Sequence, residues 1–263
     1  MQEVLWGLVN LAQAAFLAAW SVICISAALV VRLFDRELPV AMSRTCWAPA
    51  LVAATGARVT VRRRGPQADP RRPAIYVMNH RSLLDIPLAM TCLPANLRFV
   101  AKSSLRGVPF LGWYLRATGM VFIDRADHAQ AVRSLDGAAD SLRRGESLFV
   151  FPEGTRSRDG RLLPLKKGAF VLAIQAGVPI VPVVAVGADR ILPPDGFRIR
   201  PHRIRVAVGH PIDASLYTLA DRDALASDVR AAMLRLRDSL QHPDAATCRT
   251  PPHSRALPLA GAR

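Results

Sequence analysis

The stretch YVMNHRSLLDIPL, from Tyr76 to Leu88, places the polar residues NHRS between two apolar runs. The apolar residues before the polar group are typical of a buried strand. Ser82 is a favourable N-cap and Asp85 stands three residues later, which is the spacing of a capping box. The stretch therefore predicts a strand, a polar loop and then a helix from Ser82 to Cys92.

The chain beyond Arg58 repeats this alternation. Strands separated by helices indicate a largely parallel sheet that is covered on both faces. We therefore expect an α/β fold with a mostly parallel mixed sheet covered by helices, within a domain of residues 58–241. The predicted strands are RVTVRR, AIYVMN, LRFVA, MVFI, SLFVF, IVPVVAV and RIRVAV, and further helices are predicted at Ala129–Arg143, Lys167–Ala176 and Leu219–Gln241.

Three polar clusters follow predicted strands. They are NHRS, the pair Asp124 and Arg125, and the run PEGTRS from Pro152 to Ser157. Functional residues of such sheets gather in loops at the carboxyl ends of the strands. We expect these clusters to meet at one edge of the sheet.

The N-terminal residues 1–57 predict a membrane-anchoring helical segment. No charged residue occurs in the 28 positions from Val4 to Val31, and a helix needs roughly 20 apolar residues to cross a bilayer core. A cleaved signal peptide is the alternative. A second apolar run, Cys46–Ala57, predicts the return arm of a helical hairpin, and the sequence leaves open whether the first helix spans the membrane or lies in its interface. Arginines after the first run predict that the rest of the chain faces the cytoplasm; they are Arg32, Arg36 and Arg44.

The charge of the chain points to an anionic partner. Lys and Arg outnumber Asp and Glu by 35 to 20, which gives a net charge of +15. The densest basic cluster, VRRRG from Val61 to Gly65, has no interleaved aromatic residues, so nucleic acid is disfavoured. The isolated cysteines and the spacing of His80, His128, His202 and His210 suggest no metal site. The Pro-rich and Arg-rich tail, residues 242–263, is expected to be disordered.

His80 and Asp85 allow two interpretations. Asp85 could only cap the helix while His80 only ends the strand. If the loop folds back, however, the carboxylate would hold one ring nitrogen as a donor and leave the other as a base. Such a base could deprotonate a hydroxyl group that the substrate itself supplies.

Four blocks of sequence resemble the glycerolipid acyltransferase family, and within it the 1-acyl-sn-glycerol-3-phosphate acyltransferases. They are NHRSLLD, GMVFIDR from Gly119 to Arg125, FPEGTRS from Phe151 to Ser157, and VPIVPV from Val178 to Val183. The resemblance implies transfer of an acyl chain from acyl-CoA or acyl-carrier protein to the sn-2 hydroxyl of lysophosphatidate. It implies neither a covalent acyl-enzyme nor a cofactor.

The resemblance also assigns roles to individual residues. His80 would be the general base and Asp85 its orienting partner, while Arg125, Arg156 and Lys102 would bind the phosphate of the acceptor. The loop of Glu153, Gly154 and Thr155 would offer backbone donors to phosphate or to the oxyanion of the tetrahedral intermediate. Glu153 could instead order Arg156, contact the acceptor or balance nearby arginines. The remaining residues implied, as a wall of the acyl pocket, are Val178, Pro179 and Ile180.

Two other functions remain open at this stage. The same chemistry could serve another lysolipid, such as a lyso-ornithine lipid. The chain could also be a non-catalytic membrane module that binds anionic lipid. A hydrolase is disfavoured because no Gly-x-Ser-x-Gly elbow lies near His80 and Asp85.

Overall fold

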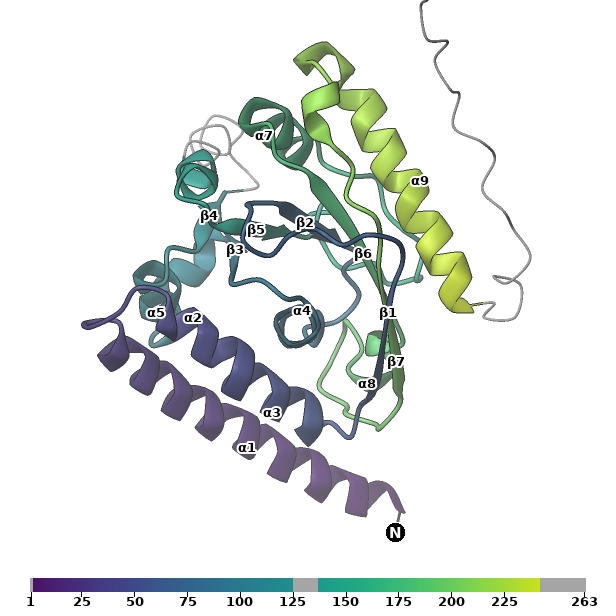
Figure 1. The fold of residues 1–263 in the computed structure, drawn as a ribbon. Coiled ribbons are helices and arrows are strands. Elements are labelled where there is room, and N and C mark those ends of the chain that lie inside the picture. Colours follow the sequence, from purple (N-terminus) through teal and green to yellow (C-terminus); the bar gives the residue numbers. More distant parts are fainter. Residues whose placement is uncertain (1, 125–136, 242–263) are drawn as a thin grey trace, which may run out of the picture.

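The structure is a computed structural model that describes residues 2–124 and 137–241. Within these residues seven strands form one sheet in the order β1-β7-β6-β2-β5-β3-β4, with helices on both faces (Figure 1). All seven predicted strands are present: β1 Arg58–Arg63, β2 Ile75–Met78, β3 Leu97–Lys102, β4 Val121–Ile123, β5 Ser147–Val150, β6 Ile180–Val186 and β7 Arg203–Val208.

The direction of the strands confirms the predicted mixed sheet. Strands β4, β3, β5, β2 and β6 are parallel neighbours, whereas β7 runs antiparallel to β6 and parallel to β1. Five strands therefore end at the same edge, which we call the carboxyl edge. The loops NHRS and FPEGTRS both leave this edge.

Alternate residues of the central strands pack on opposite faces, as the pleat of a strand requires. Tyr76 and Met78 of β2 join one hydrophobic core, and Ile75 and Val77 join the other. The first core lies under α4 (Asp85–Cys92), α5 (Leu111–Ala117) and the N-terminal helices; the second lies under α7 (Gly168–Ala176) and α9 (Arg222–Gln241). The short elements are α8 Ala188–Ile191, η2 Ser103–Gly107, η3 Ala214–Leu216 and η4 Leu219–Asp221.

The predicted helices are found with shifted boundaries. The helix expected from Ser82 begins at Asp85, because a turn at residues 83–84 precedes it. The helix expected from Leu219 starts with the turn η4. Residues 137–143 are helical, whereas the first part of the helix predicted at Ala129–Arg143 and the tail of residues 242–263 lie outside the described residues.

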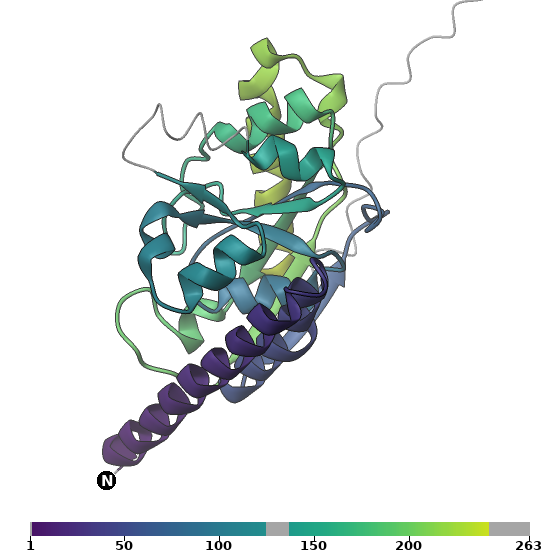
Figure 2. The ribbon, with the colours of Figure 1, turned by 90° about the vertical axis from the view of Figure 1, so that its left-hand side faces the viewer.

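The N-terminal residues form the predicted helical hairpin. Helix α1 (Gln2–Val31) lies beside a return arm made of α2 (Leu38–Met42), the π-helical turn η1 (Ser43–Trp47) and α3 (Ala48–Ala54), as Figures 1 and 2 show. The return arm begins at Leu38 rather than at Cys46, so that boundary was wrong. The apolar run starts only at Cys46, because the polar residues 43–45 precede it. The arm itself begins at Leu38, just after a turn in which the Asp35 carboxylate accepts from the amides of Glu37 and Leu38.

Polar contacts hold α1 along the body of the protein. Asn10 exchanges two hydrogen bonds with the backbone of Ile199, and near the other end Arg32 Nε donates to the carbonyl of Ala117 at 2.7 Å. The segment Glu3–Val31 is long and apolar enough to cross a membrane, and most of it is not buried. The hairpin shares the core of the sheet, because Ala28 and Val52 belong to the same hydrophobic cluster as Tyr76. Residue 57 thus marks a change of structure but not a separate core.

Candidate active site

The loop after β2 brings His80 and Asp85 together. His80 Nδ1 lies 3.0 Å from Asp85 Oδ2, and the same oxygen accepts hydrogen bonds from the backbone amides of Arg81 at 2.7 Å and Ser82 at 2.8 Å. Asp85 is 1 % exposed. A carboxylate with this contact holds Nδ1 in the protonated form and leaves the lone pair on Nε2.

The capping interpretation and the orienting interpretation of Asp85 both describe this geometry. The carboxylate accepts from the amide of Ser82, as in a capping box, while Ser82 Oγ accepts from the amide of Leu84 at 3.1 Å. Ser82 Oγ also donates to the carbonyl of Leu192 at 2.7 Å. One oxygen of Asp85 thus starts the helix and fixes the imidazole of His80.

Phe151 supports the ring of His80 from the neighbouring strand. The two rings stack with their centroids 3.8 Å apart and their planes 15° apart. Phe151 in turn packs edge-on against Phe149 in the core. Phe151 is not recognisable as a site residue from the sequence, because an aromatic residue at the end of a strand is indistinguishable from a core residue until the neighbouring strand is known.

Glu153 has a role that none of the sequence interpretations included. Its two oxygens accept the backbone amides of His80 and Leu163, each at 2.8 Å, and the residue is 3 % exposed. The amide of Ser157 donates to the carbonyl of His80 at 2.8 Å. Glu153 therefore braces the His80 loop instead of ordering Arg156. Burial raises the pKa of Glu153, and these two amides oppose that rise only in part.

Replacing Glu153 with glutamine is expected to lower the free energy of unfolding by about 1–3 kcal/mol. Each carboxylate oxygen accepts one amide, so the side-chain NH₂ of glutamine would face an N–H group and leave it without a partner. Chemical denaturation measures the difference. Glu3→Gln is the control, because the Glu3 side chain is 82% exposed, and an equal effect of both substitutions would contradict the bracing role.

Gly154 shapes the turn that follows β5. Its φ of +72° is a left-handed conformation that favours glycine, and its amide donates to the carbonyl of Phe151 at 3.1 Å. This amide therefore closes the turn, which argues against its expected role as a donor to a bound oxyanion. Thr155 is exposed beside it.

Basic side chains lie at the same carboxyl edge. Lys102 ends β3, and Arg156 is half-buried and forms no ion pair with another residue in the described ranges. Arg125 lies outside the described residues. Lys166, which sequence reasoning missed, is tied to this loop because its amide donates to the carbonyl of Pro152 at 2.7 Å. No motif marks Lys166 in the sequence.

Arg81 is also part of the scaffold of this edge. Its Nη2 contacts Asp189 Oδ2 at 2.7 Å, and the two side chains are only 18% and 21% exposed. Because Asp189 belongs to α8, the pair joins the NHRS loop to the end of β6. Asn79 reinforces the same connection by exchanging hydrogen bonds with the backbone of Ala185 at 3.0 and 2.8 Å.

Val178, Pro179 and Ile180 lie at the other edge of the sheet. Ile180 is in register with Ile75, at the start of β2, and His80 comes five residues later. A strand rises about 3.3 Å per residue, so roughly 16 Å separates these positions along the sheet. The structure therefore does not bring the expected acyl-pocket wall to His80. Among the described residues no group of three His, Cys, Asp or Glu side chains could hold a metal ion.

Residues 58–186 match the sequence model of a family described as Acyltransferase. A 1-acyl-sn-glycerol-3-phosphate acyltransferase of Brassica napus is 40% identical over 144 residues, which cover 54% of this chain and 42% of the relative. One of Arabidopsis thaliana is 36% identical over 63% of this chain and 45% of the relative. The chain therefore spans about half the length of the curated relatives it matches.

The fold also matches a solved structure. The 1-acyl-sn-glycerophosphate (LPA) acyltransferase PlsC from Thermotoga maritima is 26% identical, with a TM-score of 0.76. The match covers 96% of this chain and 100% of that one. The similarity includes the N-terminal hairpin as well as the sheet, since so little of the chain is left unmatched.

Proposed function

The chain belongs to the acyltransferase family through its residues 58–186, and on this premise we propose that it acylates the sn-2 hydroxyl of 1-acylglycerol 3-phosphate. The product is phosphatidic acid, so the reaction belongs to phospholipid biosynthesis. The observation that carries the proposal is the contact of His80 Nδ1 with the buried carboxylate of Asp85. Names of the relatives support the same acceptor.

The proposed reaction uses His80 Nε2 as the general base. It takes the proton of the sn-2 hydroxyl while the oxygen attacks the thioester carbonyl of the acyl donor. The tetrahedral intermediate then expels the thiolate, which takes the proton from the imidazolium. Asp85 stabilises the charged ring between these steps and holds its orientation. No atom of the protein is acylated, and no cofactor takes part.

The phosphate of the acceptor is proposed to bind the cations at the carboxyl edge. Arg156 and Lys102 lie there, and Arg125 belongs to the same predicted group. A guanidinium group suits this task because it donates two parallel hydrogen bonds to phosphate oxygens. Thioesters of either coenzyme A or acyl-carrier protein are proposed as acyl donors.

The proposed location is the cytoplasmic face of the inner membrane. Leu5, Leu8 and Leu11 of α1 are each more than 60% exposed, while Asn10 and Arg32 bind the body of the protein. These contacts support a helix that lies in the interface with the sheet beside it, where a lysolipid acceptor is delivered by the membrane.

Acyl transfer is tested with labelled acyl-CoA and labelled acyl-carrier protein, each offered with lysophosphatidate, a lyso-ornithine lipid or 1-monoacylglycerol. Acyl transfer to lysophosphatidate is expected to be about tenfold to a hundredfold faster than transfer to monoacylglycerol. Monoacylglycerol has no phosphate and therefore cannot form the charge-assisted hydrogen bonds. Reactions without an acyl donor are the control. Product from the lyso-ornithine lipid alone would contradict the acceptor, and absence of product from every pair would contradict the acyltransferase activity.

A further inference from the structure

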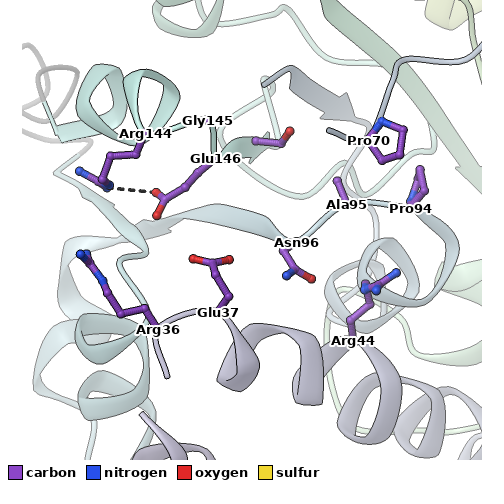
Figure 3. A pocket seen from close by; sticks show the side chains of 11 residues that line it. Arg36, Glu37, Arg44, Pro70, Pro94, Ala95, Asn96, Arg144, Gly145 and Glu146 are labelled. Carbon is purple, nitrogen blue, oxygen red and sulfur yellow. Dashed lines mark hydrogen bonds and ion pairs between the residues drawn. The ribbon is translucent and has the colours of Figure 1, made fainter. Parts of the chain in front are cut away.

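A cavity of about 520 Å³ opens at the amino ends of the strands, on the edge opposite to His80 (Figure 3). It lies between the turn that joins α1 to α2, the return arm, and the starts of β3 and β5. We call it the amino-edge pocket. The polar residues that line it include Arg36, Glu37, Arg44, Asn96, Arg144 and Glu146.

The two carboxylates of the amino-edge pocket are already neutralised. Arg98, which is 2 % exposed, contacts Glu37 and Glu146 with the same Nη2 atom. Arg144 contacts the other oxygen of Glu146 at 3.0 Å. Burial would raise the pKa of Glu146, but the hydrogen bond from Arg144 and the charge of Arg98 outweigh it and lower that pKa. Each of these two guanidinium groups thus contacts a carboxylate, although Nε and Nη1 of Arg98 are buried without a hydrogen-bond partner.

Two further arginines of the pocket lack such partners. Arg36 and Arg44 form no ion pair within residues 2–124 and 137–241. Arg44 Nε is buried without a hydrogen-bond partner, and so is the acceptor Oδ1 of Asn96. With four arginines against two glutamates, the pocket and its floor carry a net charge of +2. A bound group with anionic oxygens and a donor would satisfy both buried atoms.

We propose that the amino-edge pocket binds the headgroup of an anionic membrane phospholipid. Arg36 and Arg44, which lie on opposite sides of the pocket in Figure 3, would attract the phosphate from two sides, and Asn96 Oδ1 would accept a hydrogen bond from a headgroup hydroxyl. Leu33 and Phe34, two of the most exposed apolar residues at 80% and 85%, lie in the same turn as Arg36. Asp35 stands between them and Arg36, and its carboxylate accepts the amides of Glu37 and Leu38. The turn therefore offers apolar side chains for acyl chains beside cations for a phosphate, a combination that favours a lipid over a soluble phosphate.

This site is distinct from the site of the proposed reaction. Glu146 precedes β5, whereas Phe151, which stacks on His80, follows it. The bound lipid would hold the turn of the hairpin at an anionic membrane surface and so fix the orientation of the sheet. The inference does not rest on acyl transfer, because its test needs no acyl donor.

The test compares binding of the full chain to vesicles of phosphatidylcholine and to vesicles that also contain phosphatidylglycerol, by flotation. The double variant Arg36→Gln/Arg44→Gln is expected to lower the preference for the anionic vesicles about tenfold or more. Arg64→Gln/Arg235→Gln removes the same charge from exposed positions elsewhere and is expected to change the preference less than threefold. An equal loss in both double variants would overturn the proposal, because it would show that only overall charge matters.

A single variant and a competition experiment test the same site independently. Arg36→Gln alone changes one exposed residue outside the helices and is expected to lower the preference about threefold or more, so misfolding cannot explain the result. Inorganic phosphate and glycerol 3-phosphate, at matched ionic strength, are expected not to release the wild type from anionic vesicles. If either compound released the wild type, the proposal of a lipid ligand would be wrong, and the pocket would instead bind a soluble phosphate compound.

Discussion

Replacing His80 with alanine is expected to lower the rate of acyl transfer by about 10²- to 10⁴-fold, the usual contribution of general base catalysis. The NHRS and FPEGTRS loops contain no other histidine that could replace this base. The variant is expected to stay folded but to lose about 1–2 kcal/mol of stability with the contact to Asp85 and the stack on Phe151, because Glu153 and Ser157 still hold the loop through the backbone of residue 80. Radiolabelled acyl transfer and thermal unfolding are measured on the same preparation.

The matched control is His210→Ala. His210 is exposed, and its Nδ1 contacts only the neighbouring carbonyl of Pro211. This substitution is expected to leave the rate unchanged. If His80→Ala retained turnover within a factor of a few while remaining folded, the proposed base would be wrong. The chain would then fit a lipid-binding module better than an enzyme.

Local pattern was enough to find the sheet and one part of the site. The predicted strands are short runs rich in apolar and β-branched residues, and parallel strands bring their carboxyl ends to one edge. This rule predicts the NHRS loop and the FPEGTRS loop at the same edge, and the amide of Ser157 donates to the carbonyl of His80 there. His80 and Asp85 are five residues apart, so a single turn of chain decides whether they meet.

Contacts between distant segments could not be predicted in this way. Glu153 accepts the amide of His80 across 73 positions of sequence, and a carboxylate in a basic loop is more simply interpreted as a partner for arginine. The stack of Phe151 on His80 depends on β5 being the neighbour of β2, which periodicity does not specify. The role of Val178, Pro179 and Ile180 as a wall of the acyl pocket stays a prediction, because membership of a motif does not say how far from His80 the residues lie.

In the N-terminal hairpin, the start of the return arm could not be predicted from local pattern either. An uninterrupted apolar run predicts the extent of a helix well, and α1 follows it closely. The return arm is exposed on only one side, since Val40, Ala48 and Val52 are buried in the hydrophobic core that it shares with the sheet. Such an arm can include Arg44, which faces the amino-edge pocket. The length of the apolar run therefore underestimates the length of the arm.

Replacing Asp85 with asparagine is expected to lower both the activity and the stability. Three donors converge on Asp85 Oδ2, from His80 Nδ1 and the amides of Arg81 and Ser82. An asparagine must place its oxygen there, so the contacts persist without the negative charge. Hydrogen bonds to a charged group are about twice as strong as neutral ones, so the loss is roughly 3 kcal/mol in total. For a chain of this size, the midpoint of thermal unfolding should fall by about 5 to 10 °C.

The rate of the folded Asp85→Asn variant separates the two roles of this carboxylate. Without its charge the imidazolium formed during the reaction is less stable, and we expect a loss of about 10²-fold or more at temperatures where the variant is folded. Asp213→Asn is the control, because Asp213 caps the short helix η3 by accepting the amide of Ser215 and contacts no histidine. It should lose a little stability and no activity. If Asp85→Asn lost stability but kept its rate, Asp85 would only cap α4, and His80 would work without an orienting carboxylate.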